Sequence, residues 1–112
     1  MQLIRNDIIL DEDNLTTSTS TIVDLSQLTG IAVQAVCIDE GPDPLNAVIK
    51  LQASNDGDNF ADIHGASKTL TGSGTTVMNL PTSYFKWLKF VYTPISGQVH
   101  LQVRVAARDG KQ

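Results

Sequence analysis

The clearest pattern in the chain is an alternation of apolar and polar side chains over residues 98–105. The apolar positions are Val99, Leu101, Val103 and Val105, and the polar ones are Gln98, His100, Gln102 and Arg104. Successive side chains of a β-strand point to opposite faces, so a period of two predicts a strand. One face of this strand is expected to pack in a core, and the other to face water or a partner.

Other stretches carry a similar extended signature. Residues 85–93 are rich in aromatic and β-branched side chains, which strands favour. Residues 47–54 alternate, whereas residues 31–38 are almost all apolar and predict a strand buried on both faces. Turn residues at 94–97 and at 71–74 separate neighbouring extended runs. We therefore expect each of these two turns to close a hairpin.

Together these runs predict one all-β domain over residues 1–112, an antiparallel β-sandwich or jelly roll of about eight short strands. A chain of 112 residues is long enough for one hydrophobic core and too short for two. Residues 1–20 would form an arm or an edge segment. The reason is that the Ser/Thr tract at 15–21 favours extended backbone and the core pattern resumes directly after it.

Charge is unevenly distributed along the chain. The net charge is -4, yet residues 1–62 hold eleven acidic and two basic side chains, and residues 63–112 hold one acidic and six basic ones. Interleaved strands would mix these charges, or a charged face would meet its complement on a neighbouring subunit. The acidic balance argues against nucleic-acid binding. No apolar run is long enough for a membrane span, so we expect synthesis in a cytoplasm without a membrane step.

Few residues of the chain could support catalysis or bind a transition metal. Cys37 is the single cysteine and lies in an apolar run, which excludes an internal disulfide and predicts a buried thiol. His64 and His100 are the only histidines, and their spacing with Cys37 matches no zinc-ligand pattern. We therefore predict no enzyme activity, no metal site and no cofactor, and we expect both histidines at a surface or an interface.

Three carboxylates, those of Asp56, Asp58 and Asp62, fall in one loop. Calcium takes several oxygen ligands from acidic loops, but here a glycine follows the first Asp directly and no glutamate closes the loop, unlike in an EF-hand. Asn55, Asp56 and Gly57 instead predict a structural turn, because Asn and Asp bond back to the backbone and Gly accepts a positive φ. Whether these carboxylates also bind a cation stays open.

Residues 51–63, LQASNDGDNFADI, resemble the strand-turn-strand motif Q-x-S-N-D-G-x-x-W-x-D-I of small β-sandwich virion structural proteins of tailed bacteriophages. Phe60 stands where that motif usually has Trp, and the aromatic ring is expected to pack into the sandwich. The resemblance continues along most of the chain, from the Ser/Thr tract to the last strand. The same Ser-Asn-Asp-Gly turn also occurs in discoidin-like carbohydrate-binding sandwiches, so it indicates a shared hairpin and not a shared function.

The phage resemblance implies a virion structural protein, such as a head decoration, head-fibre or tail-associated subunit, located in the virion after synthesis in the host cytoplasm. By analogy, its partners would be other copies of itself, in a trimer, and the major capsid or tail proteins. The interface is then expected on the polar side of the last strand and on the N-terminal arm. The residues predicted to form it are Gln98, His100, Gln102, Arg104 and Arg5.

The alternative function is a carbohydrate-binding, discoidin-like host-recognition module. Exposed aromatic rings at one end of the sandwich, such as those of Trp87 and Tyr84, would then bind a glycan. Large aromatic side chains in an alternating strand are also what a core requires, so core packing explains the same residues.

Overall fold

The alternation of apolar and polar side chains corresponds to eight strands in the computed structural model, which describes residues 4–25, 30–80 and 86–108. The strands are β1 (Ile4–Leu15), β2 (Thr19–Asp24), β3 (Gly30–Asp39), β4 (Asn46–Ser54), β5 (Ala61–Leu70), β6 (Gly74–Leu80), β7 (Trp87–Ser96) and β8 (Val99–Arg108). No helix in this part of the chain is long and apolar enough to cross a membrane.

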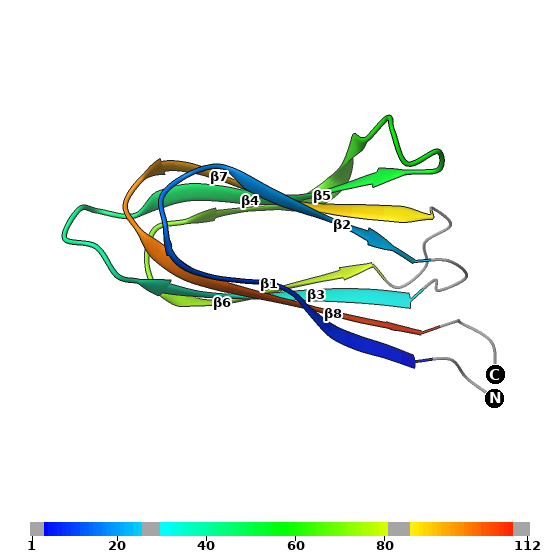
Figure 1. The fold of residues 1–112 in the computed structure, drawn as a ribbon, viewed down its shortest axis with the longest axis horizontal. Helices are drawn as coiled ribbons and strands as arrows, with labels where there is room; N and C mark the ends of the chain where they lie inside the picture. The colour runs from blue at the N-terminus through cyan, green and yellow to red at the C-terminus, as the bar shows by residue number, and fades with distance from the viewer. Residues whose placement is uncertain (1–3, 26–29, 81–85, 109–112) are drawn as a thin grey trace.

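Two four-stranded sheets pack face to face, with the strand orders β1-β8-β3-β6 and β2-β7-β4-β5 (Figure 1). All the pairings within them are antiparallel. The predicted antiparallel β-sandwich of about eight strands is therefore confirmed. β1 and β2 are edge strands on the same side of the sandwich, where the Thr21 hydroxyl donates to the Ile9 carbonyl oxygen at 3.4 Å.

Most consecutive strands lie in different sheets, which corrects two of the expected hairpins. β5 and β6 belong to different sheets, and so do β7 and β8. Pro94 lies inside β7, opposite Ala47, at a shift in the register between β4 and β7. The reversal of β7 into β8 comes later, at Gly97, where φ is +94°. Turn residues mark where the chain reverses, but the choice of sheet depends on pairings between distant strands.

The core lies between the two sheets and is built from alternate residues of each strand. Val99, Leu101, Val103 and Val105 are fully buried, as the pattern of β8 predicts. The expectation for residues 31–38 is wrong in one respect. Ile31, Val33, Ala35 and Cys37 are buried, but Gln34 and Ile38 are exposed. A sheet in a two-layer sandwich has only one face toward the core, so an apolar side chain on the other face meets solvent or a partner.

Candidate functional site

The predicted interface residues lie mainly on the outer face of the sheet β1-β8-β3-β6. His100, Gln102 and Arg104 are half-buried on the outer side of β8, since the buried residues alternate with them. Gln98 lies in the connection between β7 and β8, where its side-chain amide donates to Asn14 Oδ1 at 2.6 Å. Arg5 is in β1, paired with Ala107, and its side chain lies outside the described part of the structure.

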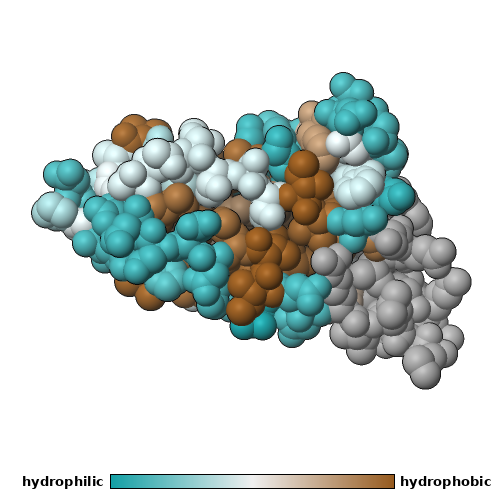
Figure 2. Space-filling model, viewed as in Figure 1, coloured by the Kyte–Doolittle hydropathy of each residue, from teal (hydrophilic) through white to brown (hydrophobic). Residues whose placement is uncertain are grey.

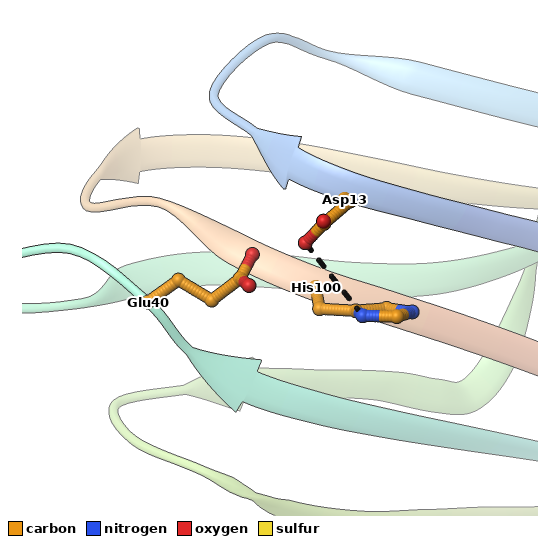
Figure 3. Close-up of side chains that lie close together, drawn as sticks. All are labelled: Asp13, Glu40 and His100. Atoms are coloured by element: carbon orange, nitrogen blue, oxygen red, sulfur yellow. Dashed lines mark ion pairs between the residues drawn. The ribbon is translucent and has the colours of Figure 1, made fainter.

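One end of this face brings His100 together with acidic side chains from two other segments (Figure 3). Asp11 Oδ1 lies 2.7 Å from His100 Nε2, and Asp13 Oδ1 lies 3.7 Å from His100 Nδ1. The ligand atoms of Asp13, Glu40 and His100 all fall within 4.8 Å of one another. We call Asp11, Asp13, Glu40 and His100 the histidine–carboxylate cluster.

The backbone at this end explains how distant residues meet. A register shift between Glu12 and Leu15 and a left-handed Asn14, with φ 54°, turn the end of β1 over the start of β8. Asn tolerates this conformation better than other non-glycine residues. The Asn14 N–H donates to Glu40 Oε1 at 3.0 Å, and the Glu40 N–H donates to the Gln98 carbonyl at 2.8 Å. These bonds connect three segments of the chain.

The charges of the cluster affect one another. The hydrogen bond that His100 donates to Asp11 raises the pKa of His100, with smaller contributions from the charges of Asp11, Asp13 and Glu40. The same bond lowers the pKa of Asp11, helped by the Gln102 side chain. The cluster can therefore hold a proton on the imidazole, and its nitrogen and oxygen atoms are of the types that bind divalent cations. Its members are distant in the sequence, so no local motif indicates it.

The turn between β4 and β5 contains the other group of carboxylates. Asp56 Oδ1 accepts hydrogen bonds from the Ser54 hydroxyl at 2.7 Å and from the N–H groups of Asp58 and Asn59 at 2.9 and 2.8 Å. Its Oδ2 accepts from Asn59 Nδ2 at 2.8 Å. These bonds, first of all those from Asn59, hold the pKa of Asp56 far below its usual value. Asn55 and Gly57 lie in the same turn, with Gly57 at φ +83°.

Asp62 lies apart from Asp56. Its carboxylate accepts from Gln52 Nε2 at 2.8 Å and pairs with Lys50 Nζ at 3.3 Å, and these contacts lower its pKa. The carboxylates of Asp56 and Asp62 thus have different partners, and in the described residues Asp56, Asp58 and Asp62 do not form a cation-binding group.

The described aromatic side chains outside the core are half-buried, and each has a lysine ammonium group near its ring. Trp87 is half-buried, with Lys86 Nζ 5.2 Å from its ring centroid. Phe60 is also half-buried, with Lys89 Nζ at 5.3 Å. Phe60 is not part of the buried core, which corrects the expectation that it packs into the sandwich. Tyr84 lies outside the described residues.

An apolar surface lies along the side of the sandwich where β1 and β2 meet. Figure 2 shows hydrophobic surface gathered midway along this side, with hydrophilic surface toward one end. The exposed fraction is 47% for Ile8 in β1 and 50% for Ile22 in β2, and Ile9 and Leu10, which follow Ile8 in β1, are partly buried. We call these four residues the isoleucine edge.

Similarity to known proteins is confined to the fold. No protein-family model matches the sequence, and no curated protein matches it. The SPBc2 prophage-derived protein YomS has a similar structure, with a TM-score of 0.62 at 10% identity over 96% of this chain and 95% of that one. The PBSX exported protein XepA gives a TM-score of 0.70 at 11% identity over 96% of this chain, which spans only 38% of XepA.

A chain from the Bacillus endospore appendages, which are disulfide-linked pili, gives a TM-score of 0.53 at 13% identity, covering 96% of this chain and 88% of that one. At these identities the likeness shows a common β-sandwich, and phage-derived proteins are among those that have it.

Proposed function

We propose that this chain is a bacteriophage virion structural protein, a head decoration, head-fibre or tail-associated subunit that acts through protein–protein interfaces and not by catalysis. The isoleucine edge carries this proposal. The phage-derived proteins that share the fold and the phage-like motif at residues 51–63 support it.

The isoleucine edge is unusual for the rim of a sheet. Edge strands of free monomers are commonly protected by charged residues, because unpaired backbone groups and apolar side chains invite association. β1 has such protection at Asp11, Glu12 and Asp13, but its middle carries the consecutive apolar residues Ile8 to Leu10. Removing exposed apolar surface from water contributes about 25 cal/mol per Å², which offsets the entropy lost on association.

A register shift between Ile8 and Leu10 interrupts the regular ladder at this point. A bulge of this kind bends the edge and disfavours simple extension of the sheet by another strand. The partner is therefore expected to pack against side chains. Arg104 lies opposite Ile8 in the register, and Gln102 lies opposite Asp11. The predicted polar interface residues thus border the apolar edge, an arrangement of apolar centre and polar rim common in interfaces.

The test is the mass of the purified chain by light scattering at about 0.05 and about 0.5 M salt, which brackets the range where exposed charges become screened. We expect a closed oligomer that persists at high salt, and a shift toward monomer in Ile8→Ser and Ile22→Ser. The matched control is Ile95→Ser, because Ile95 is 68% exposed on β7, beyond the residues of β7 that pair with β2. A wild-type chain that stays monomeric and does not sediment with the virion would overturn the proposal.

A further inference from the structure

The histidine–carboxylate cluster offers one imidazole nitrogen and two carboxylates that converge from three separate segments. We propose that Asp13, Glu40 and His100 bind a divalent transition-metal ion of the zinc type, with Asp11 as a positioning residue that holds the imidazole. This inference does not depend on the proposed function, since the ligands all come from a single chain.

The contact with Asp11 determines which tautomer the neutral imidazole adopts, and so which ring nitrogen is free to bind a metal. An ionised carboxylate accepts but does not donate, so at 2.7 Å from Asp11 Oδ1 the His100 Nε2 carries the proton. In the neutral ring the lone pair is then on Nδ1, the nitrogen on the side of Asp13 (Figure 3). Metal-binding histidines are commonly oriented, and made more basic, by a carboxylate that accepts a hydrogen bond from the ring nitrogen that does not bind the metal.

The spacing of the ligand atoms fits a shared ion better than it fits direct hydrogen bonds. Asp13 Oδ1 is 3.7 Å from His100 Nδ1, which is too long for a hydrogen bond. Two ligands bound tetrahedrally to zinc at about 2.1 Å each are separated by about 3.4 Å. Glu40 completes the group, with all the ligand atoms within 4.8 Å of one another, and the bond that its Oε1 accepts from the Asn14 N–H holds this side chain near the other two.

Charge also favours a cation here. Asp13 and Glu40 bring two negative charges together, and Asp11 adds a third beside the same ring. A divalent ion would relieve their repulsion more fully than the single charge of a protonated imidazole. One nitrogen and two oxygen ligands suit zinc-like ions better than calcium, which prefers a larger set of oxygen ligands. Water would complete the coordination, since Asp13 and Glu40 are exposed.

The experiment is calorimetric titration of the full chain, without a histidine tag, with Zn²⁺ at pH 7.5 and with Ca²⁺ as the comparison. We expect one Zn²⁺ per chain and weaker or undetectable Ca²⁺ binding. Asp13→Asn, Glu40→Gln and His100→Ala should each weaken Zn²⁺ binding, and His100→Ala by more than about a hundredfold; Asp11→Asn should weaken it by about tenfold. The matched control is His64→Ala, which removes the other histidine, exposed on β5.

Zn²⁺ should also raise the Tm of the wild type and not that of His100→Ala, because a ligand that binds the folded chain stabilises it. A circular dichroism spectrum unchanged in His100→Ala shows that the variant folds, and His100→Gln serves as a second variant of similar size. The proposal is overturned by the absence of saturable Zn²⁺ binding, by binding that survives both His100 variants, or by equal loss in His64→Ala. None of these outcomes bears on the isoleucine edge, so the two proposals fail separately.

Discussion

The two acidic regions of the molecule use their carboxylates in opposite ways. In the turn between β4 and β5, Asp56 receives hydrogen bonds from the backbone and from two side chains. In the histidine–carboxylate cluster, Asp13 and Glu40 converge on a histidine, and Asp13 lies beyond hydrogen-bond distance from it. The first region has a complete set of donors within a few residues, whereas the second combines acceptors from distant segments.

The difference shows that the number of carboxylates in a loop says little about ligand binding. A carboxylate supplied with local donors organises the backbone, and its charge is already stabilised, as the far lower pKa of Asp56 indicates. Carboxylates that converge from distant segments, as those of Asp13 and Glu40 do beside His100, form the arrangement that we propose for a metal ion. The comparison predicts that changes in the turn region affect stability alone, and that changes in the cluster affect ligand and proton binding.

The largest effect on stability is expected at Gly97, beside the cluster. Its φ is +94°, and an added Cβ would lie 2.9 Å from Leu45 Cα, which is backbone that cannot move aside easily. Gly97→Ala is therefore expected to lower the free energy of unfolding by about 3 kcal/mol, from a left-handed alanine and the overlap together. Denaturant unfolding measures this loss. The control Gly74→Ala, with open space around the added Cβ, should stay within about 0.5 kcal/mol of the wild type.

If Gly97→Ala were as stable as Gly74→Ala, the close approach of the β7–β8 connection to Leu45 would be wrong. The arrangement of the cluster would then be in doubt as well, because Gln98 and His100 follow in the same segment.

A smaller loss of stability is expected from Asp56→Ala. The substitution removes the acceptor for the N–H groups of Asp58 and Asn59, so the turn loses its organising side chain while water still solvates these groups. We expect a lower Tm and faster amide exchange at 58 and 59, with unchanged Zn²⁺ binding. Asp58→Asn is the control, since Asp58 contributes its backbone N–H to the turn. Loss of metal binding in Asp56→Ala would contradict the division of roles between the two regions.

The parts of the fold that could be predicted from the sequence are those with local causes. Side chains alternate along a strand because of backbone geometry, so β8 and the alternating stretch of β4 could be located directly. The turn at Asn55 to Gly57 is largely local, since Ser54 and Asp56 bond to backbone groups within three residues, whereas the bond from the Lys86 N–H to Asn55 Oδ1 is long-range. The fold class follows from many such short strands and turns.

What could not be predicted depends on contacts between distant segments. Gln34 is the one polar residue in the run from Ile31 to Ile38, and a single polar residue is too little to predict that one face lies outside the core, since the other outer residues are apolar like the inner ones. The assignment of β7 and β8 to different sheets is also a matter of long-range pairing. The histidine–carboxylate cluster depends on both, since Glu40 follows β3 and His100 lies in β8.

The smallest effect is expected from the pH dependence of stability, which tests the cluster without a metal. The pKa of His100 is raised by Asp11, so its contribution is present below about pH 6.5, the unfolded value, and is lost as the pH rises through the folded pKa. The pKa of Asp11 is lowered, so its contribution is present above about pH 3.9 and is lost as the pH falls through the folded pKa. The pair should therefore stabilise the end of β1 most at about pH 4 to 6.5, with Asp13 and Glu40 adding to the effect on the imidazole.

Thermal unfolding in a metal chelator should show a small Tm difference between the wild type and His100→Gln that is largest near pH 5 and shrinks by pH 8. His64→Gln is the control, and its difference should not follow the same profile. A difference for His100→Gln that stayed constant or grew toward pH 8 would mean that Asp11 and His100 do not pair in solution, and the contrast between the two acidic regions would lose its physical basis.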